Sequence, residues 1–138
     1  QVNLTTPIEI IQALISNMKS KRYGRIINIS SVFGNVSKEK RISYSSSKFG
    51  LKGATLAIAA EVAKFNILIN CVSPGFTLTD LTKRILKDDG IKEIELSIPI
   101  GRLAEVQEIS KVVLFVASDL NSYISGQDII VDGGFVNV

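Results

Sequence analysis

Tyr44 and Lys48 stand four residues apart in the segment YSSSK, and Ser31 stands thirteen residues before the tyrosine. On a helix, residues with i and i+4 spacing project from one face, so the two side chains would be neighbours. A neighbouring ammonium favours the phenolate over the phenol, and a phenol adjusted in this way can transfer a proton near neutral pH. The spacing therefore predicts a general acid or base at Tyr44.

The expected secondary structure places Ser31 near this pair. Residues 25–30 are rich in β-branched side chains and predict a strand, and residues 43–64 predict a helix that carries Tyr44 and Lys48. Open α/β sheets bind ligands beyond the carboxyl ends of their strands, where Ser31 would hold a substrate oxygen beside the phenol. A Tyr-x-x-x-Lys pair by itself is more often a coincidence of surface residues, so the surrounding motifs must support it.

The remaining segments predict an α/β fold. We expect a helix at 6–24, opened by a capping box of Thr6 and Glu9, and a second strand at 67–73 that is apolar at almost every position. Further on, the patterns predict a short helix at 80–87, a turn at 88–90, a helix at 105–119 and a strand at 128–134. Alternating strands and helices indicate a parallel sheet with right-handed crossovers. Three strands are few for a doubly wound sheet.

Composition excludes several classes of function. The 138 residues are 46% hydrophobic, enough for one compact domain, and the 16 basic residues are balanced by 13 acidic ones, so we expect no nucleic-acid partner. The chain has no histidine, which excludes a Ser-His-Asp triad and most zinc sites; we expect no metal. Its one cysteine, Cys71, lies in an apolar run and is expected to pack as a small hydrophobe. We expect no membrane span, and a reducing, cytoplasmic setting.

Four segments, taken together, resemble the short-chain dehydrogenase/reductase family, and especially its 3-oxoacyl-carrier-protein reductase-like branch. They are INISSVFG, YSSSKFGLKGAT, INCVSPGFTLT and SGQDIIVDGG. The resemblance implies a Rossmann-type doubly wound parallel sheet, with NADP or NAD as cofactor. It also implies hydride transfer between the nicotinamide and a carbonyl or secondary alcohol, with reduction of a 3-oxoacyl thioester as one candidate reaction.

The same resemblance assigns catalytic roles. Tyr44 would give a proton to the carbonyl or take one from the alcohol, and Ser31 would orient that oxygen. Lys48 would favour the phenolate and bind the nicotinamide ribose, and Asn3 would complete a proton path to solvent. In SPGFTLT, the residues Pro74, Gly75, Thr77 and Thr79 would lie against the nicotinamide. Without the family, Pro74-Gly75 would be interpreted as an ordinary turn.

Partners are also implied by the resemblance. The substrate would be a small carbonyl compound or alcohol, either free or bound to a carrier protein. Relatives form dimers and often tetramers through the helices that correspond to residues 7–21 and 43–64, so we expect a homodimer or homotetramer. The charged loop at 37–41 could meet an anionic substrate or carrier, although a solvated loop explains it as well.

Two motifs of the family do not occur in this sequence. Neither the Gly-x-x-x-Gly-x-Gly turn that cradles the dinucleotide phosphates nor the later Asn-Asn-Ala-Gly segment is found. We therefore expect residues 1–138 to be one partial domain, the C-terminal half of a dehydrogenase, and to be inactive in isolation. The alternative to an oxidoreductase is that the chain is a catalytically inactive fragment or an interaction module. The strand at 25–30 would then have an unpaired edge that another segment or copy covers.

Overall fold

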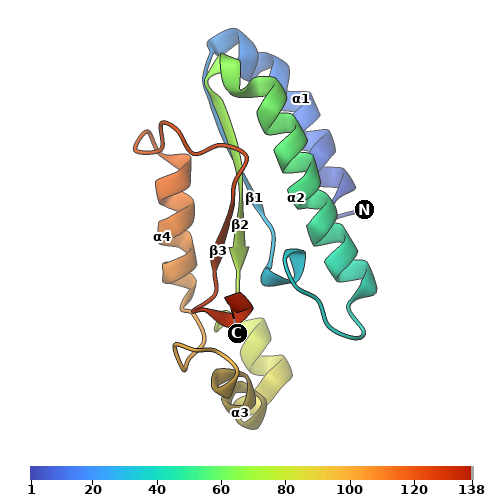
Figure 1. Ribbon diagram of the computed structural model, residues 1–138, viewed down its shortest axis with the longest axis vertical. Helices are drawn as coiled ribbons and strands as arrows, with labels where there is room; N and C mark the ends of the chain where they lie inside the picture. The colour runs from blue at the N-terminus through green and yellow to red at the C-terminus, as the bar shows by residue number, and fades with distance from the viewer. Residues whose placement is uncertain (138) are drawn as a thin grey trace.

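A computed structural model describes residues 1–137 and shows a parallel sheet with helices on both faces (Figure 1). In chain order the elements are α1 (Thr5–Lys21), β1 (Gly24–Ile29), the 3₁₀ turn η1 (Val32–Gly34), α2 (Ile42–Val62), η2 (Ala63–Phe65), β2 (Ile67–Pro74), α3 (Asp80–Leu96), α4 (Val106–Ala117), β3 (Asp128–Val131) and η3 (Phe135–Asn137).

The sheet has the strand order β1-β2-β3, and both pairs are parallel. Gly24 pairs with Ile67 at the start of the first pair, and Cys71 pairs with Asp128 at the start of the second. Helix α2 connects β1 to β2, and α3 and α4 lie between β2 and β3 in the chain, as crossovers require. The predicted parallel α/β fold is therefore confirmed. In the described part of the chain β1 pairs with β2 alone, and what covers its other edge stays a prediction.

The central strand β2 is apolar because the sheet is covered on both sides. Helices α1 and α2 lie on one face and α4 lies on the other (Figure 1). Ile67 and Ile69 are fully buried and pack with Ile11 of α1 and with Val62 of α2. Because close packing holds β2 rigidly, the residues that follow its carboxyl end are attached to a fixed strand.

Helix α1 differs from its predicted form at both ends. It begins at Thr5, with Leu4 as the N-cap and no side-chain capping bond, so the predicted capping box of Thr6 and Glu9 is wrong. Thr6 is already inside the first turn, where its hydroxyl cannot serve as the N-cap. The helix ends at Lys21 because Arg22 adopts a left-handed conformation with φ of 50°, and Gly24 begins β1.

Helix α3 is longer than predicted. It continues to Leu96, and the backbone break falls at Lys87 (φ 54°, ψ −178°), not in a turn at residues 88–90. Asp88 and Asp89 begin the second helical segment, where carboxylates complement the positive end of the helix dipole. Helices α2 and α4 lie within two residues of the predicted bounds.

Candidate active site

Ser31 lies just beyond the carboxyl end of β1. Its backbone is extended, with φ of −169°, and it caps the 3₁₀ turn η1. Its Oγ accepts a hydrogen bond from the Phe33 amide at 3.2 Å, which engages an oxygen lone pair and leaves the hydroxyl hydrogen to donate. The residue is 7% exposed. The turn thus presents a preoriented donor at the end of the sheet where ligands of α/β proteins bind.

Tyr44 is joined to the same turn through Phe33. The two rings pack edge to face with centroids 6.3 Å apart. Gly34 allows the turn to lie directly on α2, because a Cβ at this position would approach the Ser30 hydroxyl to 2.8 Å and the Lys48 backbone to 3.3 Å. Packing of η1 against α2 therefore brings Ser31 and Tyr44 to one end of the sheet, as the sequence predicts.

Lys48 lies one helical turn after Tyr44 and is 9% exposed. Its Nζ donates to the carbonyl oxygen of Ile29, the last residue of β1, at 2.8 Å, and lies 5.7 Å from the centroid of the Tyr44 ring. An ammonium has three donors, so two remain after the bond to Ile29. Burial lowers the pKa of Lys48 below its ordinary value of 10.5. The predicted neighbour relation between the amine and the phenol ring is confirmed.

The lowered pKa of Lys48 predicts a pH dependence of stability. Between the folded pKa and 10.5, the unfolded state binds more protons than the folded state, so stability rises with pH across this window. We expect the Tm of the wild type, relative to that of Lys48→Met, to increase as the pH is raised through the alkaline range. Thermal unfolding of both proteins at a series of pH values checks this, and parallel curves would contradict it.

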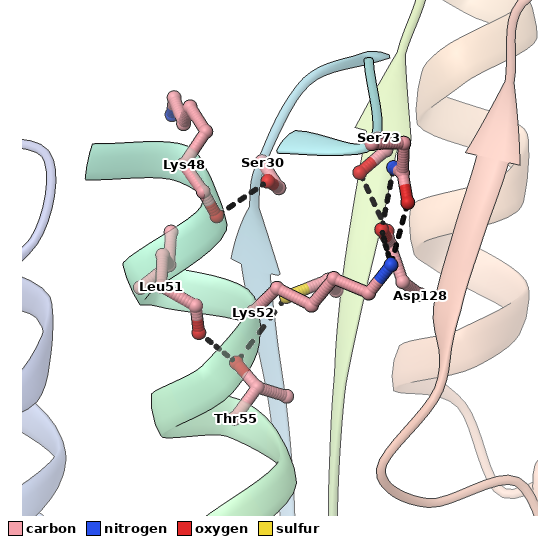
Figure 2. Close-up of polar contacts among 9 residues, drawn as sticks. Ser30, Lys48, Leu51, Lys52, Thr55, Ser73 and Asp128 are labelled. Atoms are coloured by element: carbon pink, nitrogen blue, oxygen red, sulfur yellow. Dashed lines mark hydrogen bonds and ion pairs between the residues drawn. The ribbon is translucent and has the colours of Figure 1, made fainter. Parts of the chain in front are cut away.

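The two neighbouring serines have different surroundings. Ser30 is buried, and its hydroxyl points to the backbone carbonyl of Lys48 at 3.4 Å, within the fold (Figure 2). Its hydroxyl hydrogen is engaged by α2, whereas the bond of Ser31 leaves the hydrogen available. Geometry therefore favours Ser31 over Ser30 as the serine that contacts a ligand.

Asn3 shares a groove with Lys48. The groove has a volume of about 390 Å³, and its lining includes Asn3, Pro7, Ile29 and Lys48. In residues 1–137, no hydrogen bond joins Asn3 directly to Lys48. The structure thus brings these two predicted site residues to one groove, and leaves a proton path between them as a prediction.

The segment from Pro74 to Thr79 is held by bonds within the protein. The Gly75 amide donates to the Val131 carbonyl at 2.9 Å, and a Cβ on Gly75 would approach the Asp132 Cα to 2.8 Å. The Thr77 hydroxyl donates to the Gly75 carbonyl at 3.3 Å, and the Thr79 hydroxyl caps α3. Close packing on Asp132 explains the glycine, and contact of this segment with a nicotinamide stays a prediction.

Residues 1–137 contain no exposed thiol and no cluster of side chains suited to a metal ion. Cys71 is fully buried, its thiol donates to the Thr55 hydroxyl at 3.2 Å, and burial raises its pKa, which suits a packing role. Within residues 1–137, no cluster of histidine, cysteine or acidic side chains could hold a metal. None of the helices over the same residues is long and apolar enough to cross a membrane.

Comparison with known proteins identifies the family of the chain. A family model described as enoyl-(acyl carrier protein) reductase matches residues 1–136. The 3-oxoacyl-[acyl-carrier-protein] reductase of Aquifex aeolicus is 42% identical over 134 residues, which cover 97% of this chain and 54% of that protein. The protein of the same name from Escherichia coli is 41% identical over 138 residues, covering 100% and 56%. The chain thus spans about half the length of the curated relatives that it matches.

Solved structures share the fold over nearly the whole chain. A putative gluconate dehydrogenase from Agrobacterium tumefaciens superimposes with a TM-score of 0.93 at 31% identity, covering 99% of this chain and 54% of that one. A gluconate 5-dehydrogenase from Burkholderia cenocepacia, in complex with NADP and tartrate, has the same TM-score and the same coverage at 28% identity. The fold of this chain is therefore shared with proteins that are named dehydrogenases.

Proposed function

Because this chain belongs to the short-chain dehydrogenase/reductase family, we propose that it carries the proton-transferring half of an NADP-dependent oxidoreductase that interconverts a carbonyl and a secondary alcohol. The observation that carries the proposal is the convergence of three groups at the carboxyl end of β1. These are the hydroxyl hydrogen that Ser31 has left to donate, the phenol of Tyr44, and the ammonium of Lys48 with two of its three donors left.

We propose a 3-oxoacyl thioester, presented on a carrier protein, as the substrate. Two relatives named 3-oxoacyl-[acyl-carrier-protein] reductase are 42% and 41% identical to this chain, whereas the two gluconate dehydrogenases are 31% and 28% identical. Both Ser31 and Tyr44 offer an O–H group, and in a 3-oxoacyl thioester the 3-oxo oxygen that accepts these bonds is also the atom that gains the proton.

The protein's contribution to the reaction is to hold the carbonyl oxygen and supply its proton. A nicotinamide, when bound, would supply the hydride for the carbonyl carbon. The Ser31 hydroxyl donates to the carbonyl oxygen and stabilises the charge that develops there. Tyr44 donates its phenolic proton to the same oxygen, and the Lys48 ammonium stabilises the phenolate that remains. The groove shared by Asn3 and Lys48 gives water a place from which to return a proton.

The residues of the site fit a nicotinamide nucleotide. The two donors that Lys48 has left suit the hydroxyls of a ribose, which accept hydrogen bonds. Pro74, Gly75, Thr77 and Thr79 would form the wall against the nicotinamide, and their backbone is fixed by the bonds to β3 and by the cap of α3. A fixed wall needs no reorganisation when the nucleotide binds, which favours affinity.

We further propose that residues 1–138 form one partial domain, and that the phosphates of the dinucleotide are held elsewhere. The chain matches 54% to 56% of the length of the relatives, and none of its ten glycines forms the Gly-x-x-x-Gly-x-Gly turn. Under this proposal the isolated chain binds NADPH weakly and lacks turnover. The alternative is that these residues serve only as an interaction module.

Self-association through α1 and α2 is part of the proposal. A groove of about 270 Å³ lies between the two helices, and apolar side chains of both helices line it, which favours burial against another surface. They include Ile8 and Ile15 of α1 and Ala54 and Ile58 of α2. A second copy of the protein packed on these helices would remove them from water.

A reductase assay tests the proposed function. The full-length protein that contains this chain is given NADPH with a 3-oxoacyl thioester on acyl carrier protein, and separately with a 2-enoyl thioester; gluconate is tested with NADP. We expect NADPH consumption with the 3-oxoacyl thioester only. Turnover with gluconate alone would overturn the substrate, and no turnover in any arm would overturn the function. The isolated chain is assayed in parallel, and robust turnover by it would overturn the partial-domain proposal.

A further inference from the structure

A buried carboxylate, Asp128, joins four elements of the fold. Its side chain is 5% exposed and belongs to the first residue of β3. Its Oδ1 accepts a bond from the Ser73 hydroxyl of β2 at 2.5 Å, and its Oδ2 accepts from the side-chain amide of Asn35 at 2.7 Å. Asn35 is the residue that ends η1. The ammonium of Lys52, on α2, lies 3.4 Å from the same Oδ2.

Three of these residues form a closed ring, which we call the Asp128 clamp: Asp128, Asn35 and Lys52. Besides facing Asp128, the Lys52 ammonium donates to the side-chain oxygen of Asn35 at 2.5 Å, so each member contacts the other two. Figure 2 shows the Lys52 side chain extending from α2 toward Asp128 and Ser73 at the sheet. A buried charge that loses its partner is costly, so the clamp resists opening.

The clamp is attached to both elements that carry the proposed site. Asn35 follows Ser31 by four residues, and the turn η1 lies between them. Lys52 follows Lys48 by one helical turn of α2 and Tyr44 by two. A displacement of Asn35 would therefore move the Ser31 turn relative to the helix that carries Tyr44.

We propose that Lys52, Asn35 and Asp128 are positioning residues, which hold the Ser31 hydroxyl at a fixed place relative to the Tyr44 phenol. The effect of the clamp on catalysis rests on the proposed function. The attachment of η1 to α2 and β3 through the clamp rests on the contacts described above. In a reaction that needs two donors on one oxygen, a displacement of about 1 Å can cost on the order of 10²-fold in rate. The clamp thus acts on the rate through Ser31, with no contact to the substrate.

Amide hydrogen exchange tests whether the Asp128 clamp holds η1 in place, without any assay of activity. In Lys52→Met, which keeps the length of the side chain and removes its charge, the amides of Gly34 and Asn35 should exchange about tenfold faster or more, because they close η1. Lys52→Arg should restore their protection. If Lys52→Met does not fold, the neutral pair Lys52→Met/Asp128→Asn replaces it, since no unpaired charge is then buried. Unchanged amide exchange in η1 of the Lys52→Met variant would contradict the claim that the clamp holds η1.

Kinetics in two backgrounds test the positioning role. In the wild-type background, Lys52→Met should lower kcat about 10- to 100-fold with little change in KM. In a Ser31→Ala background the same substitution should lower kcat no further, because the group that it positions has already been removed. A loss by the same factor in both backgrounds would mean a general effect on folding and would overturn the positioning role.

An ion pair that does not contact the clamp is the matched control. Arg102, in the segment before α4, and Glu108 of α4 form an exposed bidentate pair with both N–O distances at 2.7 Å. Arg102→Met should leave the exchange of η1 unchanged. If the wild type shows no reductase activity, the proposed function fails, and the exchange result alone then decides whether the clamp holds η1.

Discussion

Replacing Tyr44 with phenylalanine is expected to lower kcat about 10²- to 10⁴-fold, the range that positioned proton transfer contributes. The substitution removes only the hydroxyl, so the edge-to-face contact with Phe33 remains and the fold should not change. Steady-state reduction of a 3-oxoacyl thioester by the full-length protein measures the effect. The Tm should stay within a few degrees of the wild-type value, which separates loss of chemistry from loss of structure.

Tyr23 offers a matched control for this substitution. It is exposed, and its hydroxyl donates to the Asp119 carboxylate at 2.9 Å, away from the proposed site. Tyr23→Phe removes the same atom and should leave kcat unchanged. If Tyr44→Phe retains most of its activity, or if both variants lose activity equally, the phenol of Tyr44 is not the proton donor.

Replacing Ser31 with alanine is expected to lower kcat about 10²- to 10³-fold, as loss of one donor to a developing oxyanion does. It also removes the acceptor for the Phe33 amide, so the protein should lose roughly 1 kcal/mol of stability, as loss of a capping side chain does. Saturating substrate should not restore the rate, because the missing bond strengthens in the transition state.

Ser30 is the control for Ser31, because the two residues are adjacent and chemically identical. Ser30→Ala removes a hydroxyl that is directed to the backbone carbonyl of Lys48 and should change stability more than kcat. A larger loss of kcat in Ser30→Ala than in Ser31→Ala would mean that Ser30, and not Ser31, contacts the substrate. The site would then have a different geometry.

Periodicity predicts most of this fold, because burial on a sheet and on a helix leaves different patterns in the sequence. The apolar run of β2 indicates a strand that is covered on both faces. In the structure every residue of β2 before Pro74 is buried. Helix ends are less predictable, because local conformation decides them. Arg22 ends α1 in a left-handed conformation that its residue type does not favour, and the break at Lys87 has no glycine or proline to mark it.

Spacing alone places Tyr44 and Lys48, because a helix fixes the relation of residues four apart. The Asp128 clamp could not be predicted in that way, because its members come from segments that only the tertiary fold brings together: Asn35, Lys52 and Asp128. One signal was present. Lys52 continues the spacing of Tyr44 and Lys48 by a further turn, and a lysine on a helix face that packs on a sheet needs a buried partner.

A crystal structure of the full-length protein with NADP and an unreactive 3-oxoacyl analogue tests the central claim most directly. We predict that the carbonyl oxygen of the analogue lies within hydrogen-bond distance, about 2.6–3.2 Å, of both the Tyr44 Oη and the Ser31 Oγ. An analogue whose oxygen contacts neither hydroxyl, or contacts other residues while the nicotinamide lies elsewhere, would contradict the account.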